Sequence, residues 1–164
     1  MNNSGTFKVT APGEREIVMT RVFDVPRALV FDAFTQPPLI QRWLLGPDGW
    51  TMPVCEVDPK VGGAYRYVWR READGTEMGM GGVFREVVVP ERIVHSEKFD
   101  QPWYPGEAVV TTAFEEQAGR TTVSMSILYD SLQTRDMVLK SGMERGVAVS
   151  YDRLEAILAS SAAR

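Results

Sequence analysis

The last stretch of the chain, residues 141–159, constrains the fold more than any other part of the sequence. Apolar side chains recur there every three or four positions, the spacing of one face of an α-helix, at Met143, Val147, Tyr151, Leu154 and Leu158. Ser141 and Glu144 stand three residues apart and predict a capping box at the helix start. The helix would be a rod of roughly 27 Å, at about 1.5 Å per residue. Such a rod with one apolar stripe needs a broad surface to pack against.

The chain before this helix supplies that surface as a series of strands. Alternating apolar and polar residues, bounded by turn-forming residues, predict strands at 15–24, 51–57, 64–71, 77–89, 92–99, 108–116 and 121–129. Two short helices are expected after the first strand, beginning near Pro26 and Pro37, and a third at 132–140. No crossover helices separate the later strands, so the sheet must be antiparallel.

The order of these elements defines a fold class. One strand, two short helices, six strands and a long C-terminal helix indicate an α+β domain in which a curved antiparallel sheet wraps around the helix. This arrangement is the helix-grip fold, also called START-like or birch-pollen-allergen-like, and it often leaves a cavity between sheet and helix. We expect residues 15–164 to form this single domain. Residues 1–14 are polar and contain Gly and Pro, so we expect them to be a flexible tail.

Composition and charge exclude several classes of function. Of the 164 residues, 44% are hydrophobic and 24% charged, as in ordinary globular domains, and the net charge is −4. There is no dense run of Lys or Arg, so neither nucleic acid nor a membrane surface is an expected partner. The apolar runs are shorter than the ~20 residues that span a bilayer, and the N-terminus lacks a signal-peptide pattern. Cys55 is the single cysteine, which excludes an intramolecular disulfide, and we expect a cytoplasmic protein.

Several motifs resemble those of one bacterial family. They are Arg42-Trp43 before Gly46-Pro47, Gly62-Gly63 before an aromatic strand, Pro90-Glu91-Arg92-Ile93, and Ser141-Gly142-Met143-Glu144 with Gly146. Over residues 15–159 the chain is similar to the family that resembles the activator of the 90-kDa heat-shock protein ATPase, within the SRPBCC (START-like) superfamily. The resemblance implies the helix-grip fold and, from the family name, a co-chaperone role. Two positions depart from the pattern, since Leu44 and Val147 stand where the family usually has a tryptophan and another aromatic residue.

Aromatic residues concentrate at one place in the predicted sheet. Tyr65, Tyr67 and Trp69 share one face of a strand. Val147 places a small side chain on the helix that faces them, where the family usually has an aromatic one. We therefore expect a hydrophobic cavity that binds a small molecule, with an ordinary packed core as the alternative. The predicted ligand-binding residues are Trp43, Tyr65, Tyr67, Trp69, His95, Glu97, Met143, Val147 and Tyr151. The loop Trp103-Tyr104-Pro105 is expected either to form a lid or to be simply packed.

Few residues suggest catalysis or metal binding. His95 is the only histidine and has no partner at metal-ligand spacing, so neither a metal nor an organic cofactor is expected. Glu97 shares the strand face of His95, and the pair would orient a ligand or act as acid and base if that face points inward. Cys55 is expected to be an inert core thiol. The glycines between residues 79 and 82 indicate a bend or a close backbone approach rather than a phosphate loop.

The sequence thus predicts a domain that binds a small hydrophobic molecule, and it leaves two rivals open. The first is an activator of a chaperone ATPase, which would need an external contact surface rather than a cavity. The second is a cyclase- or hydrolase-like enzyme that uses His95 or Glu97 in the same cavity. The sequence does not fix the oligomeric state, and a homodimer stays open.

Overall fold

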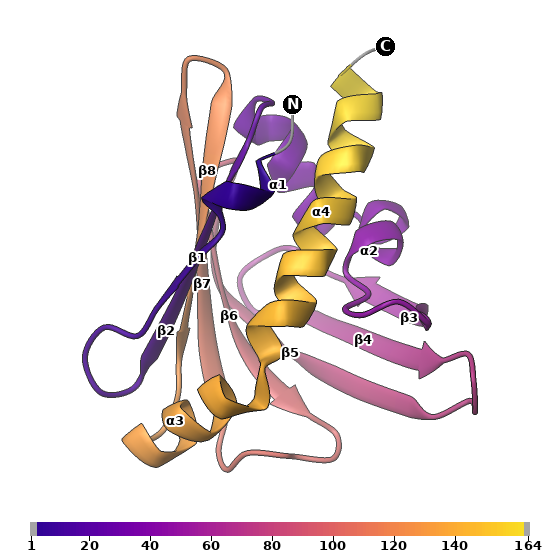
Figure 1. Ribbon diagram of the computed structural model, residues 1–164, viewed down its shortest axis with the longest axis vertical. Coiled ribbons are helices and arrows are strands. Elements are labelled where there is room, and N and C mark those ends of the chain that lie inside the picture. Colours follow the sequence, from indigo (N-terminus) through magenta and orange to yellow (C-terminus); the bar gives the residue numbers. More distant parts are fainter. Residues whose placement is uncertain (1–2, 163–164) are drawn as a thin grey trace.

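The computed structural model describes residues 3–162, and its main feature is one antiparallel sheet that curves around a long helix (Figure 1). Within these residues the eight strands follow the order β1-β2-β8-β7-β6-β5-β4-β3. In chain order the elements are the 3-10 helix η1 Ser4–Thr6, β1 Lys8–Thr10, β2 Glu16–Phe23, α1 Arg27–Thr35, α2 Pro37–Trp43, β3 Trp50–Val57, β4 Ala64–Arg71, β5 Glu77–Val88, β6 Arg92–Phe99, β7 Ala108–Gln117, β8 Arg120–Leu128, α3 Leu132–Ser141 and α4 Met143–Ala162. The predicted α+β helix-grip fold is confirmed.

Alternation along the strands sorts their side chains between the two faces of the sheet. In β2, Ile17, Met19, Arg21 and Phe23 are buried, and the residues between them are only partly buried. β2 pairs with β8 in antiparallel register, which places Met19 opposite Met125. The inward side chains of neighbouring strands therefore form one continuous surface, and α4 runs across it on the concave side (Figure 1).

Glycines allow β5 to approach its neighbours closely. A Cβ atom at Gly82 would collide with the carbonyl oxygen of Ser96 on β6, and one at Gly81 would lie 2.7 Å from the carbonyl oxygen of Tyr65. Farther along β5 the pairing with β6 shifts between Phe84 and Glu86, as at a β-bulge. The close backbone approach predicted for this stretch is confirmed, and it lets the sheet curve toward α4.

The start of α4 differs in detail from the prediction. Ser141 is the last residue of α3, and Gly142 follows in the left-handed region with φ of 77°. The Ser141 hydroxyl donates to the carbonyl oxygen of Val138 and accepts from the amide of Met143. Within the described chain no hydrogen bond joins Glu144 to Ser141, so the predicted capping box is only half present. The physical reason is the left-handed glycine, which turns the chain before α4 begins and takes Ser141 into the preceding helix.

The predicted flexible tail is wrong for residues 3–10. β1 pairs with β2 in antiparallel register, with Val9 opposite Met19. Asn3 is 5% exposed, and its amide donates to Glu155 on α4 over 2.7 Å. The ring of Phe7 lies edge-on to Tyr151, with 6.1 Å between centroids. These contacts hold the segment to α4 and to the sheet edge, whereas Met1 and Asn2 lie outside the described residues.

A buried arginine joins the sheet to α4. Arg21 is 1% exposed on the inner face of β2. Its guanidinium group donates to the carbonyl oxygen of Tyr151, to Asp152 at 3.1 Å and to Glu155 at 3.2 Å. Charge pairing offsets the cost of removing this cation from water. These contacts fix the middle of α4 on the sheet.

No helix in residues 3–162 is long and apolar enough to cross a membrane.

Candidate functional site

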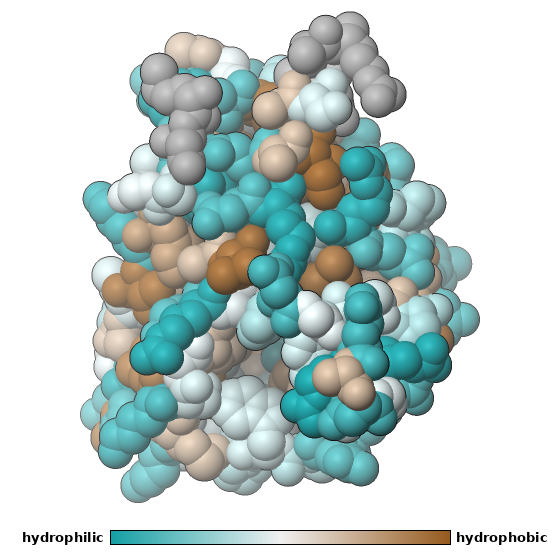
Figure 2. All heavy atoms as spheres, turned by 45° about the vertical axis from the view of Figure 1, so that its right-hand side comes forward, coloured by the Kyte–Doolittle hydropathy of each residue, from teal (hydrophilic) through white to brown (hydrophobic). Residues whose placement is uncertain are grey.

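A cavity of about 490 Å³ lies between α4 and the concave face of the sheet. Its walls come from β4 to β8, from α2 with the loop that follows it, and from the N-terminal half of α4. Met78 and Trp103 line the cavity while remaining 41% and 38% exposed, so they mark its mouth. Figure 2 shows the surface hollowed on the side of the molecule where α4 faces β4 and β5.

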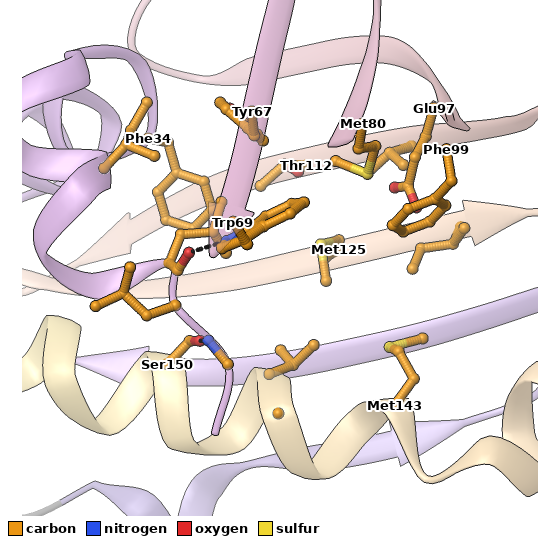
Figure 3. A pocket seen from close by; sticks show the side chains of 18 of the residues that line it. Phe34, Tyr67, Trp69, Met80, Glu97, Phe99, Thr112, Met125, Met143 and Ser150 are labelled. Atoms are coloured by element: carbon orange, nitrogen blue, oxygen red, sulfur yellow. Dashed lines mark hydrogen bonds between the residues drawn. The ribbon is translucent and has the colours of Figure 1, made fainter. Parts of the chain in front are cut away.

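The structure brings all nine predicted site residues to this one cavity. They are Trp43, Tyr65, Tyr67, Trp69, His95, Glu97, Met143, Val147 and Tyr151. Figure 3 shows labelled members of the lining, with Trp69 and Met125 between the sheet above and α4 below. The structure has a pocket at this place, as the first of the two expectations has it. Ligand binding by these residues stays a prediction.

The aromatic wall is built by β4. Alternation places Tyr65, Tyr67 and Trp69 on the inner face, with centroids of neighbouring rings 5.1 and 5.8 Å apart. The indole N–H of Trp69 donates to the carbonyl oxygen of Leu44 over 2.7 Å, the bond drawn in Figure 3. The hydroxyl of Tyr65 donates to the carbonyl oxygen of Ser96 over 2.6 Å. These bonds hold the rings of Tyr65 and Trp69 in the lining of the cavity.

Helix α4 and the loop after α2 form the opposite wall. Met143, Val147 and Tyr151 fall one turn apart on the cavity side, as the sequence period predicts. Gly146 lies between them, and a Cβ atom there would come within 3.7 Å of Gly46. The amide of Gly46 in turn donates to the hydroxyl of Ser150 over 2.9 Å. A small residue at position 146 therefore lets the loop rest directly on the helix.

Two polar side chains of β6 enter this apolar space. His95 and Glu97 are both partly buried and line the cavity, and Figure 3 shows the Glu97 carboxyl group pointing inward near Met80 and Phe99. Burial raises the pKa of Glu97 to about 7, while a hydrogen bond from Tyr104 opposes the rise. Burial lowers the pKa of His95 below its usual value, and a hydrogen bond with the Ser96 carbonyl opposes that change. Near neutral pH the pocket therefore holds a neutral imidazole and a carboxyl group that is about half ionised.

Sequence reasoning missed several members of the lining. Met80 on β5, Thr112 on β7, Met125 on β8 and Tyr129 just after it all reach the cavity. Each lies on the inner face of a correctly predicted strand, so the alternation pattern contained the signal.

The loop Trp103-Tyr104-Pro105, expected either to form a lid or to be packed, divides between the two, with Tyr104 as the packed residue. It is buried, and its hydroxyl donates to Glu97 over 3.4 Å, while its neighbour Trp103 stands at the mouth.

The site offers little for metal or covalent chemistry. Residues 3–162 contain no group of three or more His, Cys, Asp and Glu side chains that could hold a metal ion. Cys55 is only partly buried on β3, and burial raises the pKa of its thiol to about 11, so the thiolate is scarce at neutral pH. The groups that can exchange a proton with a bound molecule are Glu97 and His95.

Fold and cavity together define a helix-grip α+β protein with an internal apolar pocket. A family model described as "Activator of Hsp90 ATPase homolog 1-like protein" matches residues 24–159, so the chain belongs to this family, within the helix-grip superfamily called SRPBCC. The resemblance seen in the sequence motifs is confirmed. No functionally curated protein matches the chain.

Solved structures share the fold over nearly the whole chain. A crystal structure from Rhodobacter sphaeroides is 28% identical, with a TM-score of 0.88 over 94% of this chain and 99% of that one. A protein from Chromobacterium violaceum is 27% identical, with a TM-score of 0.77 over 87% and 96% of the two chains. An HSP90 activator from Plasmodium falciparum is 22% identical, with a TM-score of 0.61 over 88% and 96%, a likeness of fold alone.

Proposed function

We propose that this protein binds a small hydrophobic molecule in the cavity between sheet and α4. The observation that carries the proposal is a pocket of about 490 Å³ whose lining is mostly aromatic, aliphatic and methionine side chains. Small-molecule sites typically measure about 300–1,000 Å³ and combine an apolar lining with a few polar groups. Closely packed interiors do not keep voids of this size without an occupant or an opening to solvent. An apolar ligand that enters would remove this lining from water.

The position of Val147 supports the proposal. Val147 lies midway along the helical wall, between Met143 and Tyr151, and its small side chain lines the same cavity as Trp69 and Tyr67. A tryptophan at this position would project into the cavity and compete with any occupant. The same substitution elsewhere on α4 offers a matched control, because Val149 is 38% exposed and does not line the cavity.

The test is a fluorescence titration with N-phenylnaphthylamine, a neutral lipophilic dye that brightens in apolar surroundings. The wild type and Val149→Trp should bind the dye saturably at one site, and unlabelled naphthalene should displace it. Val147→Trp should bind at least about tenfold more weakly, since its indole takes the place of the dye. Saturable binding that is identical in all three proteins would locate the dye elsewhere, and no binding to the wild type would refute the proposed function.

A second candidate is activation of a heat-shock chaperone ATPase. It is favoured by the description of the family and by the fold shared with the activator from Plasmodium falciparum. We rank it below ligand binding, because the activator is only 22% identical and the likeness extends to the fold alone.

A further inference from the structure

Three donor groups of the cavity wall are occupied by the protein itself. The indole N–H of Trp43 donates to the carbonyl oxygen of Ala33 over 2.8 Å, and that of Trp69 to Leu44 over 2.7 Å. The hydroxyl of Tyr65 donates to Ser96 over 2.6 Å. Each of these groups has one proton to give, and each gives it to a backbone carbonyl. A ligand therefore finds these three donors already used.

The wall formed by β6 presents hydrogen-bond acceptors instead. Nδ1 of His95 lies 3.0 Å from the carbonyl oxygen of Ser96, and a carbonyl oxygen can only accept. In the neutral ring Nδ1 therefore carries the proton, and Nε2 is left as an acceptor. The carboxyl group of Glu97 receives a long hydrogen bond of 3.4 Å from Tyr104 and has no other hydrogen-bond partner in residues 3–162. Two residues that share one strand face thus present unused acceptors to the cavity.

The cavity also lacks a counter-charge for an anion. No lysine or arginine is among the described residues that line it, and Glu97 is the single carboxylate there. The nearby cation on β2, Arg21, is bound to Asp152 and Glu155 outside the lining. A ligand carboxylate would lose its hydration without gaining a charge partner, and it would face Glu97 at short range.

The other polar groups of the lining are neutral, and they include tyrosine hydroxyls. Tyr129 and Tyr151 line the cavity, and burial raises the pKa of both hydroxyls, so they stay protonated. A hydroxyl both donates and accepts, so these groups tolerate a neutral polar end on the ligand but bring no positive charge. They cannot replace the missing cation.

We propose, building on the proposed function, that the cavity selects hydrophobic molecules whose polar end is a hydrogen-bond donor, a hydroxyl or a protonated amine, and that Glu97 receives this donor. The pocket discriminates against hydrophobic carboxylates such as fatty acids. The donor end lies beside β6 near Phe99 and Met80, and the apolar body extends along Trp69 toward Tyr151. Hydrogen bonds to an ionised carboxylate are stronger than those between neutral groups. This difference in strength is the source of the preference for ligands with a donor end.

A set of naphthalene derivatives with the same apolar body tests the proposal. Naphthalene, naphthol, naphthylmethylamine and naphthoate would each displace N-phenylnaphthylamine at pH 8, where most Glu97 side chains are ionised. In the wild type we expect the amine and naphthol to bind roughly tenfold more tightly than naphthalene, and naphthoate at least about tenfold more weakly.

Variants then assign the preference to one side chain. Glu97→Gln keeps the shape of the side chain, removes its charge and adds an N–H donor. It should bind naphthalene as the wild type does, while the ratio of amine to naphthoate affinity falls at least about tenfold. The matched control is Glu115→Gln on neighbouring β7, since Glu115 is exposed and does not line the cavity. It should behave as the wild type.

The outcomes separate the two proposals. If naphthalene and the dye bind but naphthoate binds as well as the amine, the selection for donors is wrong and the hydrophobic site stands. An unchanged preference in a folded Glu97→Gln protein would also overturn the role of Glu97. If none of the compounds binds the wild type, the proposed function itself fails. The ligand series in the wild type decides the selectivity even if the variant does not fold.

Discussion

Val147 stands on the cavity side of α4 with neighbours on only part of its surface. Its side chain is partly buried, whereas Leu154, two turns later on the same helix, is fully buried. The two positions therefore differ in free volume although both lie on the apolar stripe. A large side chain can enter open space at position 147 but must displace packed neighbours at position 154.

This difference predicts opposite effects of one substitution. Val147→Trp should keep or raise the melting temperature, because the indole fills part of the cavity. Leu154→Trp should lower it, since overpacking a full core typically costs about 1–3 kcal/mol. Thermal unfolding followed by circular dichroism would check both. A marked fall in melting temperature for Val147→Trp would mean that the space around this position is already filled.

Glu97 makes the stability of the protein depend on pH. Its pKa is about 7 in the folded protein against an ordinary value of 4.5. Between these values the folded protein holds more protons than the unfolded chain, so stability falls as the pH rises through this window. A shift of this size corresponds to at most about 3 kcal/mol.

Removing the carboxylate should remove this dependence. We expect Glu97→Gln to melt several degrees above the wild type at pH 8 and to come close to it at pH 4, where Glu97 is mostly protonated in both states. Melting curves over this pH range for both proteins give the difference directly. Equal melting temperatures at pH 8 would show that the Glu97 carboxylate is not destabilised by its surroundings.

At the residue level, periodicity was sufficient to find the lining but not the ion pairs. The spacing on α4 and the alternation on β4 and β6 placed eight of the nine predicted residues at the cavity, and Trp43 comes from α2. Alternation also puts Arg21 on the same face of β2 as Ile17 and Met19, and in the structure this face is the buried one. Its partners Asp152 and Glu155 could not be predicted, because they lie more than 130 positions later and meet it only after the sheet curves.

Among the elements, α4 depends on Arg21 for its attachment to the sheet. The side chain of Glu155 is 20% exposed and also accepts the amide of Asn3, while that of Asp152 is 54% exposed. The more buried carboxylate is the one that balances the buried cation best, since water screens the other. The two acidic residues should therefore contribute unequally.

We expect Glu155→Ala to lower the free energy of unfolding by about 2–3 kcal/mol. Breaking a buried ion pair outright costs ~3–5 kcal/mol, and the loss here is smaller because Asp152 still pairs with Arg21. Asp152→Ala should cost less than about 1 kcal/mol, as for exposed ion pairs. Urea unfolding at neutral pH would measure both. Equal losses would show that exposure does not decide how the charge of Arg21 is balanced.

The sequence predicted long elements better than short ones. The strands at 64–71 and 92–99 match β4 and β6, and the others are correct to within one or two residues, because alternation over eight or more positions is hard to mistake. β1 has three residues, too few to show a period, and it exists because the edge of β2 offers a free row of backbone groups. The start of α4 was misplaced because a left-handed glycine overrode a local capping pattern.

For the whole molecule, the family description raises the question of a chaperone partner. The chain is acidic, with a net charge of −4, and contains no dense run of basic residues that would steer it to an acidic partner surface. We expect no stimulation of a bacterial chaperone ATPase at equimolar concentration. A steady-state ATPase assay, with an established activator as positive control, checks this. Stoichiometric stimulation that Val147→Trp leaves intact would favour the second candidate function and an external contact surface.

Helix α4 carries two sets of residues that meet at Tyr151, which lines the cavity and whose carbonyl oxygen accepts from Arg21. Its C-terminal half is fastened by Arg21, by buried Leu154 and Leu158, and by Asn3. Its N-terminal half, after the break at Gly142, contributes Met143, Gly146 and Val147 to the cavity. Changes at Met143 and Val147 would alter the size and shape of the pocket and leave the contacts of Arg21 and Asn3 in place. Substitutions in this one short segment would therefore resize the pocket while the rest of α4 keeps its place on the sheet.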